Sequence, residues 1–175
     1  MEKKYITMRY AKAYDIDTLA SLHVRTFRSA YQGILPDSYL EKITFKSRKA
    51  AFSKLILELH IPQAIFFYKD EAIGFAVFGP CRDEDLPGYG QIQGIYIVPE
   101  YQRLGFGSLF FQWCLRELKK QGFTKICIWV FATNHRAIAF YQSQKFEFDG
   151  VAKEVFYDEP LQQKRLLRTL PWLGT

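Results

Sequence analysis

Hydrophobic residues recur along this chain with two spacings, and each spacing predicts one kind of element. Short apolar runs and apolar–polar alternation predict strands, while recurrence every three to four residues predicts helices. The expected strands cover residues 5–10, 64–68, 73–78, 91–98, 125–131, 145–148 and 166–170. One expected helix begins at Asp15 or Asp17 and ends before Gly33, and the others cover residues 37–43, 46–59, 107–120 and 134–144. Because strands and helices interleave, the pattern indicates an α/β fold with a mixed sheet and helices on its faces.

The length and composition suit one globular domain. The chain has 175 residues, within the usual range of about 100 to 200 for a single domain. Hydrophobic residues make up 49% and aromatic residues 17%, enough for a sizeable core and too many for a disordered chain. We therefore expect residues 1–175 to form a single domain.

The charge is moderately basic and evenly scattered. Lys and Arg number 24 against 18 Asp and Glu, which gives a net charge of +6. No basic stripe with interleaved aromatic residues is visible, so nucleic acid is not the expected partner. A surplus of this size keeps a surface solvated or attracts a polyanionic ligand, and a phosphorylated cofactor fits it better.

The cysteines and the first residues bear on the compartment. Cys81, Cys114 and Cys127 form neither an even set nor a C-x-x-C pair, which argues against a disulfide framework and a metal site. The first ten residues lack the apolar core of a signal peptide, and no uncharged apolar run reaches about 18 residues. We expect a cytoplasmic protein that neither enters a membrane nor is exported.

The stretch I-Y-I-V-P-E-Y-Q-R-L-G-F-G-S at residues 95–108 carries the strongest chemical signal. A β-branched run stops at Pro99, and a polar loop ends in two glycines where a helix begins. Successive backbone N–H groups and a helix N-terminus form an anion site when no Cβ blocks the approach. The expected phosphate-binding residues are Gln102, Arg103, Leu104, Gly105, Phe106, Gly107 and Ser108.

Two common phosphate motifs do not match this loop. A Walker A loop needs Gly-Lys-Ser/Thr, but Gly107 is followed by Ser108 and Leu109. The dinucleotide fingerprint needs a third glycine where Phe110 stands. The order strand, Val-Pro-Glu-Tyr-Gln-Arg-x-Gly-x-Gly, helix instead resembles the acetyl-CoA loop of the GNAT superfamily of N-acetyltransferases.

A second motif supports the same resemblance. N-H-R-A-I-A-F-Y, from Asn134 through Ala137 to Tyr141, is similar to the N-x-x-A-x-x-x-Y helix of that superfamily, although Lys145 replaces the usual glycine before Phe146. The resemblance covers about residues 91–150. It implies a GNAT-like, mostly antiparallel central sheet with helices on both faces, and acetyl-CoA as the cofactor.

The resemblance also implies roles. A neutral amine would attack the thioester directly, with the backbone N–H of Val98 as the oxyanion donor and Tyr141 as the acid that protonates the leaving sulfur. Asn134 would hold the pantetheine arm or a water, although alone it also suits a helix N-cap, and Tyr141 alone suits a core position. The remaining cofactor contacts implied are Tyr96, Ile97, Val98 and Ala137.

The general base is not evident. Family members often carry a glutamate where this chain has Gln91 or Trp129, and neither side chain can accept the proton. Acidic residues at positions 83–85 could act through water or attract a cationic amine, but a solvated loop tip is the plainer interpretation, and the chain could also lack a dedicated base. His23 suits the core. The candidate acceptor-binding residues are Phe27, Tyr31, Asp83, Glu84, Asp85 and Gln91.

The sequence therefore predicts an acetyl-CoA-dependent N-acetyltransferase acting on the primary amine of a small molecule. Two alternatives stay open. One is acetylation of protein amino termini or lysines, and the other is a non-catalytic coenzyme A sensor, suggested by the missing glutamate. The acceptor cannot be named from the sequence, and a homodimer is left open.

Overall fold

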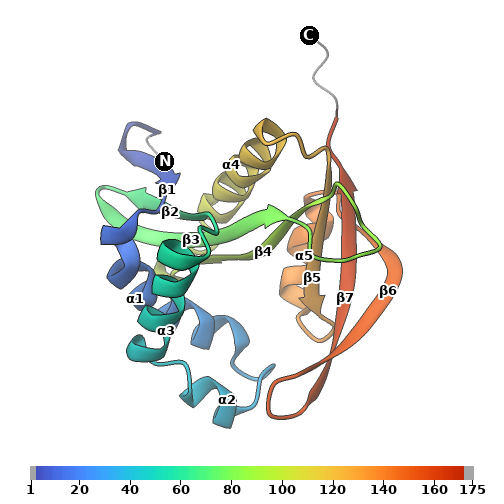
Figure 1. The fold of residues 1–175 in the computed structure, drawn as a ribbon, viewed down its shortest axis with the longest axis horizontal. Coiled ribbons are helices and arrows are strands. Elements are labelled where there is room, and N and C mark those ends of the chain that lie inside the picture. Colours follow the sequence, from blue (N-terminus) through green and yellow to red (C-terminus); the bar gives the residue numbers. More distant parts are fainter. Residues whose placement is uncertain (1–2, 172–175) are drawn as a thin grey trace.

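The computed structural model describes residues 3–171, which form one seven-stranded sheet in the order β1-β2-β3-β4-β5-β7-β6. Neighbouring strands are antiparallel except for the parallel pair β4 and β5. The prediction of a mixed, mostly antiparallel sheet is confirmed (Figure 1). The strands are β1 (Ile6–Tyr10), β2 (Gln63–Tyr68), β3 (Glu71–Pro80), β4 (Gly90–Ile97), β5 (Lys125–Phe131), β6 (Glu147–Phe156) and β7 (Pro160–Thr169).

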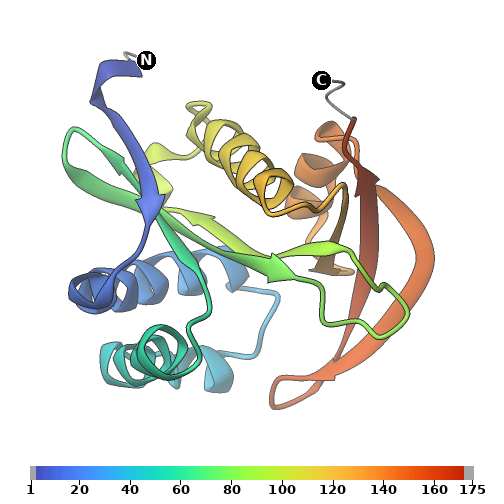
Figure 2. The same ribbon diagram turned by 45° about the horizontal axis from the view of Figure 1, so that its top comes forward.

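The helices cover both faces of this sheet. Figure 2 shows α1 and α3 on one face and α4 on the opposite face, with α5 near β5. The α-helices are α1 (Ile16–Tyr31), α2 (Asp37–Glu41), α3 (Phe45–Ser53), α4 (Phe106–Lys120) and α5 (His135–Ser143). The helix expected over residues 46–59 is α3 continued by one π-helical turn, Lys54–Glu58. No helix in the described residues is both long and apolar enough to cross a membrane.

The core is strongly aromatic and lies between the sheet and its helices. Its largest fully buried side chains include Phe66, Phe75 and Phe78 from the strands and Phe110 and Phe111 from α4. Burying one phenylalanine contributes about 1.5–3 kcal/mol. These side chains anchor α4 on the sheet and so fix the loop that precedes it.

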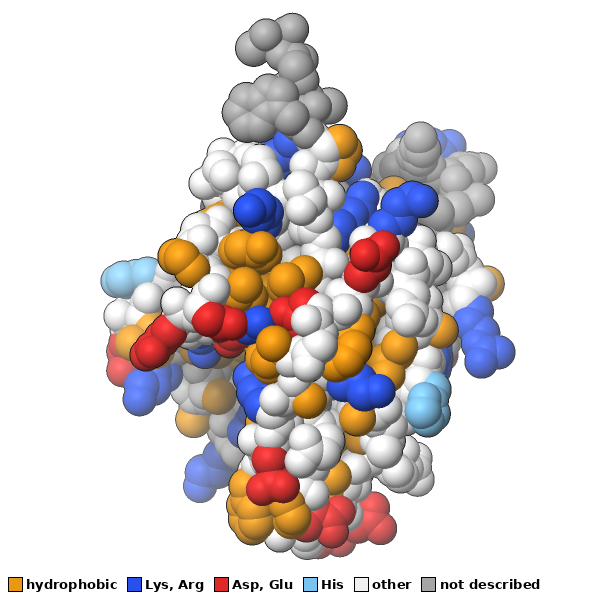
Figure 3. Space-filling view, turned by 90° about the vertical axis from the view of Figure 1, so that its right-hand side faces the viewer, with side chains coloured by type: hydrophobic (Ala, Val, Ile, Leu, Met, Phe, Trp, Pro, Cys, Tyr) orange, Lys and Arg blue, Asp and Glu red, His pale blue; other side chains and the backbone are white. Residues whose placement is uncertain are grey.

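The last two strands are longer than the pattern predicts. β6 and β7 form a hairpin of ten residues each, whereas only residues 145–148 and 166–170 are expected as strands. β6 is an edge strand whose residues are mostly exposed, so apolar alternation is weak there. Figure 3 shows this side of the molecule, where hydrophobic side chains lie among charged ones. The exposed large hydrophobic residues of β6 are Phe148, Val151 and Phe156.

The parallel pair in the middle of the sheet is short. β4 and β5 pair only at Gly90 with Ile126 and at Gln91 with Cys127. β4 instead remains paired with β3 as far as Ile97. The two strands therefore part after Gln91, and the functional cavities lie along this opening.

Candidate active site

Two cavities meet where β4 and β5 part. We call one the aromatic cavity, of about 310 Å³, and the other the loop cavity, of about 340 Å³. Both are lined by the same four residues, which form the junction: Ile95, Asn134, Ala137 and Tyr141. A reaction between two ligands, one in each cavity, would take place at these residues.

The loop cavity is lined by most of the glycine-rich segment. Five of the seven predicted residues line it: Gln102, Arg103, Gly105, Gly107 and Ser108. The other two do not, because the side chain of Leu104 is exposed and that of Phe106 is buried in the core, where it packs on aromatic rings of β2 and the loop. Only their backbone amides could serve an anion.

The backbone of this loop is shaped for an anion. Arg103 and Gly105 have φ angles of +59° and +84°, in the left-handed region that reverses the chain. Gly105 is the N-cap of α4, so free N–H groups of the first turn follow it directly. A Cβ added at Gly107 would come only within 4.0 Å of an Ile97 side-chain atom, so nothing in the protein fills the space beside that backbone.

Gln102 ties the loop to both walls of the opening. Its Nε2 donates to the Ile97 carbonyl oxygen at 2.8 Å, and its Oε1 accepts from the Arg136 guanidinium at 2.6 Å. Arg136 lies in the first turn of α5 and lines the loop cavity with Arg103. The sequence analysis missed Arg136, although it stands between the defined positions of the N-x-x-A motif. Two guanidinium groups and a helix N-terminus suit a pyrophosphate.

The predicted oxyanion donor is wrong as stated. The Val98 N–H donates to the Ile73 carbonyl oxygen at 2.9 Å, so it is part of the sheet, and Val98 is buried and lines neither cavity. N–H directions alternate along an antiparallel strand. The N–H groups of Ile95 and Ile97 therefore face the opening toward β5, and both residues line the loop cavity.

Asn134 and Tyr141 occupy the junction of the cavities. The Asn134 Oδ1 accepts a hydrogen bond from the Ala137 N–H at 3.0 Å, so this residue does cap α5. Its Nδ2 makes no hydrogen bond within the described residues. Burial, and to a lesser extent nearby Tyr31, raises the pKa of the Tyr141 hydroxyl well above its usual value. That hydroxyl is therefore protonated at neutral pH.

The aromatic cavity takes its name from the rings that line it, which belong to Tyr141 of the junction and to six other residues. The Tyr31 and Tyr96 hydroxyl oxygens lie 3.2 Å apart, and burial raises the pKa of both. Tyr96 lines this cavity and not the loop cavity expected for it. Phe27 and Tyr31 line the cavity, as expected for an acceptor wall. The sequence analysis missed the rings of Phe131 and Tyr157. The six are Phe27, Tyr31, Tyr96, Trp129, Phe131 and Tyr157.

Two of the three acidic residues expected near the acceptor, Asp83 and Asp85, form ion pairs with a buried arginine. Arg165 of β7, only 4% exposed, forms ion pairs with Asp83 at 3.3 Å, Asp85 at 2.8 Å and Asp149 at 2.8 Å. Only Asp83 of the predicted trio lines the aromatic cavity, and Glu84 is exposed away from it. Glu84 and Asp85 are therefore not acceptor contacts, and Arg165 had no signal in the sequence.

His23 and the cysteines stay outside the chemistry. The His23 ring stacks on Phe27 and lines neither cavity, and burial lowers its pKa to about 4. Cys114 and Cys127 are buried, and burial raises the pKa of both thiols. Neither thiol therefore forms a thiolate nucleophile at neutral pH.

Comparison with known proteins defines the class. The model of the acetyltransferase (GNAT) family matches residues 16–146, a range that contains the loop, the opening and the α5 motif. The chain belongs to the GNAT family and is an N-acetyltransferase, and the co-substrate of this family is acetyl-CoA.

Individual relatives agree with this assignment. The chain is 33% identical over 162 residues to the uncharacterized N-acetyltransferase YuaI of Bacillus subtilis, covering 86% of this chain and 90% of that one. Its fold is similar to a ribosomal-protein-alanine N-acetyltransferase from Brucella melitensis, with a TM-score of 0.71, 16% identity and coverage of 94% and 99%. It is also similar to PaiA N-acetyltransferase from Thermoplasma acidophilum in complex with coenzyme A, with a TM-score of 0.66, 19% identity and coverage of 91% and 98%.

Proposed function

We propose that this N-acetyltransferase transfers the acetyl group directly from acetyl-CoA to the primary amine of a small molecule. The observation that carries the proposal is the junction, where Ile95, Asn134, Ala137 and Tyr141 line both cavities. One cavity suits a phosphorylated co-substrate and the other a compact acceptor. The junction is then where the thioester and the amine are brought together.

The loop cavity would hold the co-substrate. The amides of residues 102–108, with the Arg103 and Arg136 guanidinium groups, would bind its pyrophosphate, and Ile97 and Asn134 would bind its pantetheine arm. When bound, acetyl-CoA supplies the acetyl group as an activated thioester. The free space beside Gly107, where an added Cβ would meet only an Ile97 side-chain atom at 4.0 Å, supports the fit.

Two groups of the chain would then act on the reaction. The Ile95 N–H, which faces the opening, donates to the carbonyl oxygen as negative charge develops there, in place of Val98. The C–N bond forms as the C–S bond breaks, and the Tyr141 hydroxyl gives its proton to the departing sulfur. The proton lost by the amine returns through solvent to the Tyr141 oxygen, which restores the hydroxyl.

Loss of the amine proton needs no dedicated carboxylate in this proposal. Asp83 is the only acidic residue lining the aromatic cavity among the described residues, and its Oδ2 already accepts from Trp129 at 2.8 Å and from Arg165 at 3.3 Å. Both donors would have to be displaced before this oxygen could accept the amine proton. We infer that the acceptor reacts as the fraction of free amine present at the working pH.

Two observations support a small acceptor and a cytoplasmic setting. The aromatic cavity measures about 310 Å³, at the lower end of the volumes typical of small-molecule sites. Cys81, Cys114 and Cys127 are all free thiols, which suits a reducing compartment. A second candidate is acetylation of a protein amino terminus or lysine; the Brucella neighbour, which shares the fold at 16% identity, is named as a ribosomal-protein-alanine N-acetyltransferase.

The test is thiol release from acetyl-CoA by the purified protein, with small primary amines and short peptides as acceptors. Turnover of a small amine at a kcat/KM at least tenfold above every peptide is expected. If a peptide is turned over better than every small amine, the acceptor would instead be a protein amino terminus or lysine. If calorimetry detects coenzyme A binding but no acceptor is turned over, the protein would instead be the non-catalytic coenzyme A sensor.

A further inference from the structure

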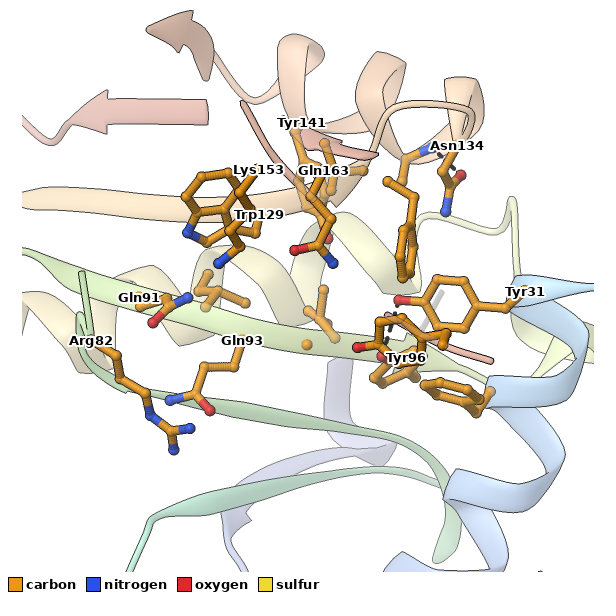
Figure 4. Close-up of a pocket in the computed structure, with 18 of the residues that line it drawn as sticks. Tyr31, Arg82, Gln91, Gln93, Tyr96, Trp129, Asn134, Tyr141, Lys153 and Gln163 are labelled. Carbon is orange, nitrogen blue, oxygen red and sulfur yellow. Dashed lines mark hydrogen bonds between the residues drawn. The ribbon is translucent and has the colours of Figure 1, made fainter. Parts of the chain in front are cut away.

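Part of the aromatic cavity is lined by polar side chains that form no hydrogen bond or ion pair with the described residues. In Figure 4, Arg82, Gln91, Gln93 and Lys153 lie on the side of Trp129, Tyr31, Tyr96 and Asn134 lie on the other side, and Gln163 lies between them. In the described part of the chain, none of their amides makes a side-chain hydrogen bond, and neither cation pairs with a carboxylate. The set, which we call the donor wall, is Arg82, Gln91, Gln93, Lys153 and Gln163.

Gln91 presents a hydrogen-bond donor to the cavity. It is only 8% exposed, and its Oε1 is buried without a hydrogen-bond partner. Its Nε2 also has no partner but is not enclosed, so it is the atom that opens into the cavity. Nε2 is a hydrogen-bond donor, so it can bind a ligand group that accepts, whereas the enclosed Oε1 takes no part in this contact.

Lys153 is held in place by an aromatic ring. Its Nζ lies 3.8 Å from the centroid of Trp129, and the Trp129 N–H in turn donates to Asp83 at 2.8 Å. This arrangement positions an ammonium group at the cavity, and no carboxylate of residues 3–171 pairs with it.

Among the described residues, Asp83 is the only carboxylate that lines the same cavity, and it pairs with neither of these cations. Asp83 is paired with Arg165 at 3.3 Å, which lies behind the wall at 4% exposure. Arg82, which is exposed, and Lys153 line the cavity and form no ion pair with a carboxylate of the described residues, so both remain available to an anionic group. A second ammonium group on the acceptor would be repelled there, whereas an anionic group would be attracted.

We propose that the acceptor carries an acidic group, a carboxylate or a phosphate, in addition to its primary amine, and that the donor wall binds this group through Lys153, Arg82 and Gln91. The amine then lies toward Tyr141 and the Ile95 N–H. This inference rests on the proposed function and reverses the expectation that acidic residues attract a cationic amine. It excludes diamines and polyamines as preferred acceptors.

The test compares matched acceptors in the thiol-release assay: an amino acid, its carboxamide, an aminoalkyl phosphate and a diamine of similar length. We expect kcat/KM for one of the acids to exceed that of the carboxamide and the diamine at least tenfold. The acid that performs better identifies the group. A preference for the carboxamide or the diamine would overturn the inference while leaving the acetyltransferase proposal intact, and turnover of none of them would overturn both.

Lys153→Met keeps a side chain of similar length over Trp129 and removes the charge. It is expected to reduce the preference for the acid over the carboxamide at least tenfold, through KM for the acid. Lys164→Met is the matched control, because Lys164 is exposed, lies 5.7 Å from the Phe148 ring and lines neither cavity. An equal preference in wild type and Lys153→Met would contradict the role of the wall.

A charge reversal gives an independent readout. Gln91→Glu places a carboxylate in the donor wall, and the preferred acceptor is expected to change from the acid toward the diamine. The ratio of the two kcat/KM values is measured within one preparation, so partial loss of folded protein cancels. A ratio unchanged from wild type would count against the proposed orientation of the acid.

Discussion

The Asn134 side-chain oxygen accepts the Ala137 N–H at 3.0 Å while the same residue lines both cavities. Asn134→Asp keeps the capping oxygen and replaces the Nδ2–H donor, so we expect unchanged thermal stability and a KM for acetyl-CoA raised about tenfold, or about 1.4 kcal/mol. Asn134→Ala also loses the cap, at about 1 kcal/mol of stability. If Asn134→Asp has wild-type kinetics, Asn134 serves only as the N-cap of α5 and does not bind acetyl-CoA.

Gly107→Ala separates folding from binding at the loop. The added Cβ meets only an ordinary contact with Ile97 at 4.0 Å, and alanine in a helical turn stabilises by about 0.5 kcal/mol relative to glycine. We expect equal or higher thermal stability together with a coenzyme A affinity lowered about tenfold or more, because the methyl group occupies the space beside the anion-binding backbone.

Calorimetry and thermal unfolding check this result. Gly79→Ala is the control, since Gly79 lies on β3, lines neither cavity, and has no atom within 4 Å of an added Cβ. Normal coenzyme A affinity in Gly107→Ala would remove the loop from phosphate binding.

Tyr141→Phe removes the proposed acid without changing the ring. We expect kcat to fall on the order of 10²-fold, the lower range for a positioned acid, with coenzyme A affinity nearly unchanged. Steady-state kinetics measure the first quantity and calorimetry the second. Tyr10→Phe is the control, because Tyr10 lies on β1 outside both cavities. An unaltered kcat in Tyr141→Phe would assign protonation of the sulfur to solvent.

His23 predicts a dependence of stability on pH. Its pKa falls from 6.5 to about 4 on folding, mainly through burial, so between these values the unfolded chain binds a proton that the folded one excludes. Stability is therefore lost as pH falls from 6.5 toward 4, by about 3 kcal/mol at most. Urea unfolding at several pH values measures this loss, which His23→Leu should reduce, while His135→Gln, at an exposed position, should not.

The fold was largely predictable because its central elements are buried on regular faces. α4 is amphipathic, and β4 and β5 are apolar runs bounded by glycine, proline or charge, so local spacing located them. The length of β6 was not predicted, because an edge strand with few buried residues shows no periodic pattern of apolar residues.

The site was predictable where it depends on local motifs and not where it depends on tertiary contacts. Gly107 and Tyr141 were located by spacing along one loop and one helix. The Val98 N–H was misassigned because hydrogen-bond direction depends on pairing with Ile73 of another strand. Likewise Arg165 joins Asp83 across 82 positions of the sequence, so their ion pair exists only in the folded chain.

β4 and β5 share only two residue pairs, and this leaves a seam that the backbone does not close by itself. Such a seam weakens the molecule, because main-chain donors on its rim have no neighbouring strand. A ligand that bonds to those donors does what a further strand would do, and adds about 2.7 kcal/mol of stability at one hundred times its Kd. The free energy of unfolding therefore rises with the concentration of a ligand that binds in the seam, and the protein is most stable when that site is occupied.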